Sequence, residues 1–203
     1  MKKAEEIYAK YLAPLSGASG CCDAHEYRAI LEHLIERTPC RLLVFGCGND
    51  SAAWLAANEG GQTLFLEDSL KWTREVGAAH PDADIVMISV TARPERWRFN
   101  LNDLRQGGGE TELALDLPDR VREIAWDFVI VDGPMGEIYG GAGRQSSLFE
   151  ASRLTAPDSV VCVHDAERPL ERHFCQELFD SDWSCCCVGR LRIYKNPSMN
   201  VKT

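Results

Sequence analysis

A short apolar run that ends in a glycine-rich turn constrains the fold of this chain more than any other stretch. Residues 41–45 read Arg-Leu-Leu-Val-Phe, and Gly46-Cys47-Gly48 and the polar Asn49-Asp50-Ser51 follow. An apolar run of this length ending at such a turn is typical of a buried parallel strand that leads into a ligand-binding loop. Because glycine lacks a Cβ, the backbone at Gly46 and Gly48 can bend sharply and lie against a cofactor. Asp50 or Ser51 is expected to cap the helix over residues 52–58.

A second apolar run, residues 62–66, ends at the acidic pair Glu67 and Asp68. Glu67 follows Gly46 by 21 residues, close to the spacing at which an acid on the neighbouring strand accepts hydrogen bonds from a ribose. The third glycine of the dinucleotide fingerprint is missing, which argues against NAD or FAD. A cofactor with a ribose but no phosphate, S-adenosylmethionine, fits better. The predicted cofactor-binding residues are Gly46, Gly48, Asn49, Asp50, Glu67 and Asp68.

The composition restricts the class of protein. The chain has 203 residues, 45% hydrophobic and 26% charged, as expected for one globular domain over residues 1–203. Its net charge of −9 argues against a nucleic-acid partner, because phosphate contacts need clustered Lys and Arg. No apolar run approaches the ~20 residues of a membrane span, so we expect a cytoplasmic protein with no membrane partner. The nine cysteines contain no C-x-x-C pair and are expected to be reduced and mostly buried.

Strand and helix patterns alternate along the chain. Further strands are expected at residues 84–90, 126–132 and 159–163, and helices at 2–13, 23–37, 70–79, 143–154 and 170–179. This alternation predicts an α/β protein with the Rossmann-like class I methyltransferase fold, a mostly parallel sheet with helices on both faces. A terminal hairpin, residues 184–188 and 191–194, places an antiparallel strand at the C-terminal edge.

Two segments outside this pattern bear on the domain organisation. Residues 1–37 are expected to form N-terminal helices and a lid, the lid being residues 14–22, in front of a Rossmann-like core over residues 38–195. Residues 91–117 fit either an insertion that covers the active site or an irregular connection.

Polar residues follow four of the expected strands, at Gly46 to Asp50, Glu67-Asp68, Asp132-Gly133-Pro134 and His164-Asp165. Ligands in open α/β sheets bind beyond the carboxyl ends of the strands, so these clusters are predicted to share one active site. The predicted catalytic residues are Asp132, His164 and Asp165. Either His164 is the base for a hydroxyl acceptor, oriented by Asp132 or Asp165, or Asp132 and Asp165 hold a divalent cation that acidifies the hydroxyl. The sequence leaves both mechanisms open.

The chain resembles the glucuronoxylan 4-O-methyltransferases, of the polysaccharide-biosynthesis methyltransferase family. The stretches that carry the resemblance are Leu43 to Ser51 with Trp54, Thr63 to Asp68 with Lys71-Trp72, Leu117-Pro118, Trp126-Asp127, Val131 to Pro134 with Gly136, Gly143-Arg144, His164-Asp165 and Gly189-Arg190-Leu191. They occur in the family's order and cover most of residues 38–195.

The resemblance implies S-adenosylmethionine at Gly46, Gly48 and Glu67, and a saccharide or other small-molecule acceptor near Asp132, Arg144, His164 and Asp165. In the family this acceptor is the 4-hydroxyl of a glucuronic acid, whose carboxylate would suit Arg144, with Gly133 and Pro134 beside it. The alternative for Arg144 is an ion pair with Asp132 or Glu150.

The chain departs from the family's pattern in three places. We expect the chain to lack the family's N-terminal membrane anchor for the Golgi, Gly133 stands where the family has alanine, and residues 93–112 match poorly. We therefore expect a soluble, anchorless O-methyltransferase acting on a uronic acid, a sugar or a related metabolite. Two other functions stay open: transfer of an aminopropyl or aminocarboxypropyl group from the same cofactor, and an inactive cofactor-binding subunit.

Overall fold

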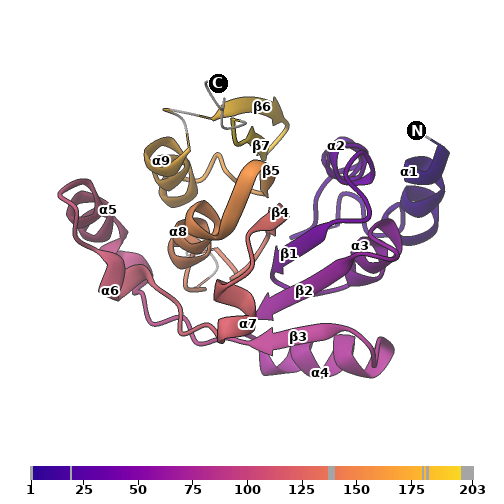
Figure 1. The fold of residues 1–203 in the computed structure, drawn as a ribbon, viewed down its shortest axis with the longest axis horizontal. Helices are drawn as coiled ribbons and strands as arrows, with labels where there is room; N and C mark the ends of the chain where they lie inside the picture. The colour runs from indigo at the N-terminus through magenta and orange to yellow at the C-terminus, as the bar shows by residue number, and fades with distance from the viewer. Residues whose placement is uncertain (1, 19, 137–139, 180, 182, 198–203) are drawn as a thin grey trace, which may run out of the picture.

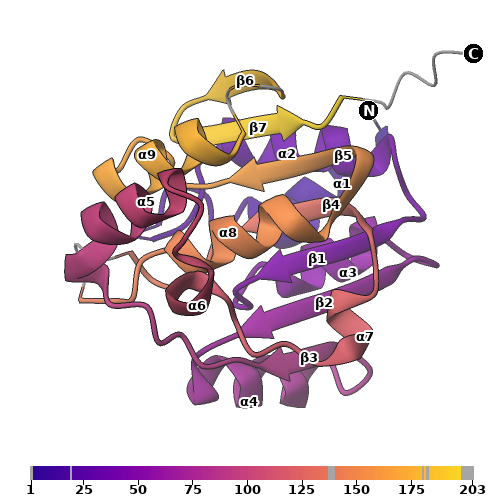
Figure 2. The same ribbon diagram turned by 60° about the vertical axis from the view of Figure 1, so that its left-hand side comes forward.

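The computed structural model of the chain describes residues 2–18, 20–136, 140–179, 181 and 183–197. Within these residues a seven-stranded sheet has the order β3-β2-β1-β4-β5-β7-β6. The strands are β1 (Arg41–Phe45), β2 (Gln62–Glu67), β3 (Asp84–Met87), β4 (Trp126–Val131), β5 (Thr155–Val163), β6 (Ser184–Val188) and β7 (Leu191–Lys195). Strands β1 to β5 are parallel, whereas β7 runs antiparallel to both β5 and β6, as Figure 2 shows. The predicted fold class is confirmed, with the C-terminal hairpin closing one end of the sheet.

The helices connect successive strands. In chain order the helical segments are α1 (Lys2–Ile7), η1 (Tyr8–Leu12), α2 (Ala24–Ile35), α3 (Ser51–Ala57), α4 (Leu70–Ala79), η2 (Pro94–Arg96), α5 (Trp97–Arg105), α6 (Glu110–Leu113), α7 (Asp119–Arg122), α8 (Gln145–Leu154) and α9 (Pro169–Leu178). The segment α2 begins as its sequence predicts, because the Asp23 side chain accepts from the backbone N–H of Glu26 while the Glu26 side chain accepts from that of Asp23.

The sheet separates two apolar layers, and alternate residues of its central strands face each layer. Leu43 and Phe45 of β1 pack in the layer under α5, α8 and α9, whereas Leu42 and Val44 pack in the layer under α1, α2 and α3. Figure 1 shows these two groups of helices on opposite sides of the sheet. A strand buried on both faces reads as a continuous apolar run, which explains the composition of residues 41–45.

For residues 91–117, the sequence left open an insertion that covers the active site and an irregular connection. The segment contains the helices η2, α5 and α6, so it is not an irregular connection. The segment α5 packs on α9, where the Trp97 and His173 rings lie 5.3 Å apart. Within the described residues, no helix is long and apolar enough to cross a membrane.

The prediction for the cysteines is correct in part. All nine are free thiols, but Cys185, Cys186 and Cys187 are exposed. They lie on β6, the outermost strand of the sheet, which has a neighbour on one side only.

Candidate active site

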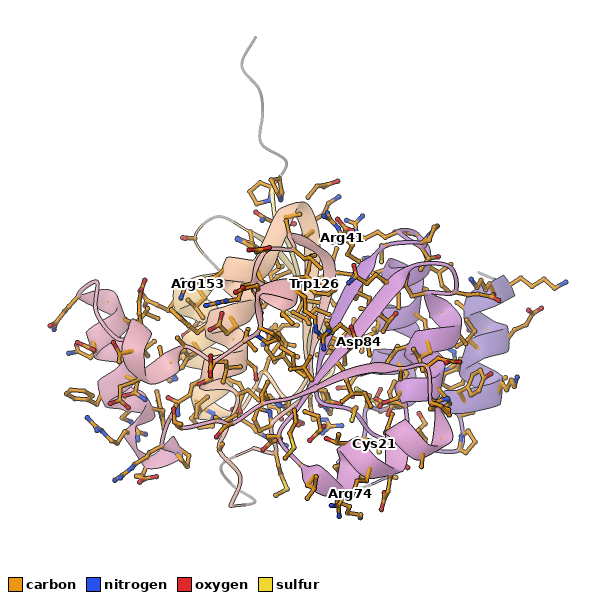
Figure 3. The ribbon with its side chains drawn as sticks, turned by 60° about the horizontal axis from the view of Figure 1, so that its bottom comes forward. Cys21, Arg41, Arg74, Asp84, Trp126 and Arg153 are labelled. Atoms are coloured by element: carbon orange, nitrogen blue, oxygen red, sulfur yellow. The ribbon has the colours of Figure 1, made fainter. Side chains whose placement is uncertain are left out.

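A cavity of about 590 Å³ lies beyond the carboxyl ends of the parallel strands. This volume is in the range of small-molecule sites. All four strand-end clusters reach it, through Gly46 to Asp50, Glu67-Asp68, Asp132 to Pro134 and Asp165. The prediction that these clusters converge is confirmed. Figure 3 shows Cys21, which lines the cavity, at the opposite end of the sheet from Arg41, the first residue of β1.

The glycine turn after β1 packs directly against the end of β4. Gly46 has a φ of +96°, and a Cβ on it would lie 3.0 Å from the backbone nitrogen of Gly133. Gly48, in contrast, faces open space, since a Cβ there would meet only Asp50 Oδ1, at 3.8 Å. The first glycine therefore permits a close approach of two strand ends, and the second leaves room beside the cavity.

Glu67 ends β2 inside the cavity and is buried. Its Oε2 accepts from the backbone N–H of Cys47 (2.6 Å) and its Oε1 from that of Ser69 (2.7 Å). Burial raises the pKa of Glu67, and these two N–H groups partly oppose that shift. A carboxylate oxygen can accept two hydrogen bonds and each accepts one here, so the group keeps the capacity to bind two further hydroxyls.

Two other cavity-lining carboxyl groups, Asp50 and Asp132, differ in their ionisation. Burial and the nearby charge of Asp132 raise the pKa of Asp50 to about 7. Burial also disfavours the charged form of Asp132, but the charges of His164 and Arg144 outweigh it and lower the pKa of Asp132. At neutral pH, Asp132 is therefore ionised while Asp50 is partly protonated, and such a divided pair is typical of catalytic sites.

The two oxygens of Asp132 have different surroundings. Oδ1 accepts from Arg144 Nη2 and lies 2.9 Å from His164 Nδ1. Within the described part of the chain Oδ2 has no hydrogen-bond partner, and the side chain is 25% exposed and lines the cavity. One oxygen is thus held by cations while the other is available to a ligand.

His164 lies where a base is not expected, so the geometry does not favour the first predicted mechanism, which stays a prediction. It is 1% exposed and, unlike Asp132, is not among the residues that line the cavity. Burial disfavours the charged ring, but Asp132, Glu26 and Asp165 surround it and raise the pKa of His164 to about 9. The ring is an imidazolium at neutral pH, with both nitrogens protonated, and it cannot accept a proton from a hydroxyl.

Glu26, which was not predicted as a site residue, is fully buried beside His164. Glu26 Oε2 lies 3.5 Å from His164 Nε2, and Oε1 accepts from the backbone N–H of Arg190 at 2.6 Å. Burial opposes the charged form of Glu26, but the neighbouring His164 ring and the hydrogen bonds from the backbone N–H groups of Asp23 and Arg190 lower its pKa to about 2. In the sequence, Glu26 is explained by the helix-capping pattern Asp23-x-x-Glu26. Its separation from His164 along the chain does not indicate that the two side chains meet.

Asp165 belongs to the same buried cluster. Its Oδ1 accepts from Arg190 Nη1 (2.7 Å), and its Oδ2 lies 2.7 Å from Arg168 Nη2 and 3.3 Å from Arg144 Nη2. Both oxygens are therefore engaged by guanidinium groups. Arg168 and Arg190 were not predicted as site residues.

Arg144 is 3% exposed, and the protein itself engages all three of its guanidinium nitrogens. Nε donates to the Pro134 carbonyl (3.3 Å), Nη1 to the His164 carbonyl, and Nη2 to the carbonyl and Oδ1 of Asp132. This arrangement matches the alternative in which Arg144 pairs with an acid of the protein. Binding of an acceptor carboxylate by Arg144 stays a prediction, and this geometry does not favour it.

The second predicted mechanism needs a divalent cation, and the ligand atoms of Asp132, His164 and Asp165 do lie within 4.8 Å of one another. The surroundings do not suit a cation. Three arginines contact the two carboxylates, and His164 is itself protonated. A metal ion would have to displace these cations from oxygens that they already neutralise.

The N-terminal segment reaches the cavity from the other side. Leu15, Gly20, Cys21 and Tyr27 line it. The first three belong to the predicted lid, and its closure over a ligand stays a prediction.

The family model described as IRX15/IRX15L/GXM matches residues 25–194. Glucuronoxylan 4-O-methyltransferase 3 of Arabidopsis thaliana is 33% identical over 186 residues, covering 83% of this chain and 62% of the relative. Arabinogalactan O-methyltransferase 1 of the same plant is 31% identical over 173 residues, covering 75% and 59%. The chain spans between about half and three-fifths of the length of such curated relatives.

Among solved structures, the chain is similar to the T. thermophilus 16S rRNA N2 G1207 methyltransferase in complex with AdoMet and guanosine. The TM-score is 0.50 and the identity 16%, over 90% of this chain and 45% of the other. This likeness concerns the fold alone.

Proposed function

The chain belongs to the IRX15/IRX15L/GXM family, and from this premise we propose that it is an S-adenosylmethionine-dependent O-methyltransferase whose acceptor is a saccharide hydroxyl. Two of its relatives are named as O-methyltransferases of glucuronoxylan and of arabinogalactan. The observation that carries the proposal is that two carboxyl groups line one cavity, Glu67 at the end of β2 and Asp132 after the end of β4, the strands on either side of β1. Asp132 Oδ2 has no hydrogen-bond partner among the described residues, and the side chain is 25% exposed.

The residues present fit the cofactor. Glu67 keeps acceptor capacity for two ribose hydroxyls, Gly48 leaves open space, and Trp72 offers an aromatic ring at the cavity wall. Asn49 and Asp68 line the same wall. When bound, S-adenosylmethionine supplies a methyl group on a positively charged sulfur, which is transferred in line to a nucleophile.

Asp132 is the proposed base. Its free Oδ2 would accept a hydrogen bond from the acceptor hydroxyl, which fixes the oxygen that attacks. A carboxylate with a lowered pKa is a weak base towards an alcohol. However, the hydroxyl proton becomes strongly acidic as the new C–O bond forms, so the proton passes to Asp132 late in the reaction. His164 and Arg144 hold Oδ1 and keep Asp132 ionised beforehand.

The test has a binding arm and a transfer arm. Calorimetry should show S-adenosylmethionine binding to the parent protein and an affinity loss of about 1.5–3 kcal/mol for Glu67→Ala, the scale for hydrogen bonds to a charged group. With methyl-labelled cofactor and a glucuronic-acid-bearing oligosaccharide, label should move to the acceptor. Asp132→Asn should lower that turnover by roughly 10²–10⁴-fold while cofactor affinity stays unchanged.

The outcomes separate the parts of the proposal. No cofactor binding by the parent protein would exclude a methyltransferase. If the cofactor binds but its aminopropyl or aminocarboxypropyl label moves to the acceptor in place of the methyl label, the alternative transferase is favoured. Full turnover by Asp132→Asn would exclude Asp132 as the base.

A further inference from the structure

A basic and aromatic surface lies on α5 and α9, outside the cavity. Arg93, Arg96, Arg98 and Arg172 are exposed, and so is Phe99, at 55%. The Arg96 guanidinium lies over the Phe99 ring, 4.7 Å from its centroid, and that of Arg98 over the Trp97 ring at 4.3 Å. This concentration of positive charge is unusual on a chain whose net charge is −9.

These arginines have no acidic partner in the part of the chain that the structure describes. Arg105, on the same helix, pairs with Glu177 at 2.6 Å. For Arg93, Arg96, Arg98 and Arg172, in contrast, no ion pair exists within the described residues. A planar guanidinium left unpaired beside an aromatic ring suits recognition of carboxylates through paired hydrogen bonds.

The surface is fixed to the rim of the cavity through two connections. Gln145, which follows the cavity-lining Arg144, donates from Nε2 to the Arg93 carbonyl (3.1 Å) and accepts at Oε1 from Asn100 (2.9 Å). Both amide side chains are buried, so the start of α5 is held rigidly against α8. Figures 1 and 2 show α5 beside α8 and α9.

The second connection runs along α9. Arg168, at the start of this helix, lines the cavity, and the exposed Arg172 lies one helical turn further on. His173 then contacts Trp97 of α5. Helix α9 therefore connects the cavity, at the buried Arg168, with the exposed arginines around the start of α5.

We propose that Arg93, Arg96, Arg98, Phe99 and Arg172 form a binding surface for the carboxylate-bearing chain of a polysaccharide acceptor. The inference rests on the proposed function, because the reacting sugar of that chain would lie in the cavity. The guanidinium groups bind uronic-acid carboxylates away from the reacting sugar, and the Phe99 ring supplies an apolar face for a sugar ring. The surface selects polymeric anionic acceptors over neutral or short ones.

Affinity electrophoresis in native gels that contain polygalacturonate, with dextran as the neutral control, tests the surface without requiring turnover. The test variant is Arg96→Gln/Arg98→Gln. The matched control is Arg74→Gln/Arg153→Gln, which removes the same charge from exposed arginines of α4 and α8 labelled in Figure 3. Polygalacturonate should retard the parent and the control equally, and the test variant should bind roughly three- to thirtyfold more weakly. Dextran should retard none of them.

Three results would overturn the inference: no retardation of the parent, an equal loss in the control variant, or stronger retardation by poly(U) RNA than by polygalacturonate. Calorimetry with S-adenosylmethionine on the same preparations shows that each variant is folded. It also separates the two proposals. Cofactor binding without polymer retardation rejects the surface alone, and polymer retardation without cofactor binding rejects the methyltransferase alone.

Discussion

Replacing His164 by glutamine should destabilise the protein by an amount that falls as the pH rises. The side chain is 1% exposed, between Asp132 at 2.9 Å and Glu26 at 3.5 Å, and its pKa rises from an ordinary 6.5 to about 9. Because folding raises this pKa, the stabilisation is fully present below pH 6.5 and is lost as the pH rises through 9.

The pKa rise sets the size of the effect. At about 1.4 kcal/mol for each tenfold change in proton affinity, the charged ring stabilises the fold by about 3 kcal/mol at pH 6 and about 2 kcal/mol at pH 7.5. By the same relation, less than about 0.5 kcal/mol remains at pH 9.5.

Urea unfolding of the parent and of His164→Gln at these three pH values measures the difference directly. His25→Gln, the same substitution at an exposed histidine, is the matched control. A difference for His164→Gln that is equal at pH 6 and pH 9.5 would show that the ring is neutral in the folded protein. It would then again be a candidate base.

Two further predictions concern the same cluster. A divalent-metal chelator should leave methyl transfer unchanged, because arginines already engage the carboxylates of Asp132 and Asp165; activity that is lost and then restored by a divalent ion would contradict this. Arg144→Lys should lower stability by about 2–4 kcal/mol, because several buried acceptors lose a donor, and the melting temperature measures it. An unchanged melting temperature with reduced turnover of a uronic-acid acceptor would instead assign Arg144 to the acceptor.

The strand ends were predictable because their signals are local. An apolar run followed by Gly46-Cys47-Gly48, and a second run followed by Glu67, define two adjacent parallel strands, and parallel strands bring their carboxyl ends to one edge. The structure pairs β1 with β2 and β4 in the register that this requires.

The role of His164 was not predictable in the same way. Its protonation depends on Glu26, which is distant in sequence and reaches the ring only because α2 packs beside β5 and β7. The helical pattern predicted α2 correctly, yet nothing local indicated that a glutamate on its largely apolar face is buried against a histidine. The helices within residues 91–117 were not predicted for another reason. In α5, the exposed Arg98 and Phe99 interrupt the apolar pattern, because this helix buries only one side.

The buried cluster connects parts of the chain that would otherwise reach the cavity independently. Glu26 on α2 contacts His164 after β5 and Arg190 before β7, and Arg190 in turn contacts Asp165. A Cβ on Gly189 would lie 2.8 Å from Glu26 Oε1, so the hairpin turn approaches the glutamate as closely as it can. His164 Nδ1 in turn lies 2.9 Å from Asp132 Oδ1, so the histidine links these segments to the Asp132 carboxylate. Helix α2, the terminal hairpin and the ends of β4 and β5 thereby hold the Asp132 carboxylate in its ionised form. Its Oδ1 is engaged, and its Oδ2 has no hydrogen-bond partner among the described residues.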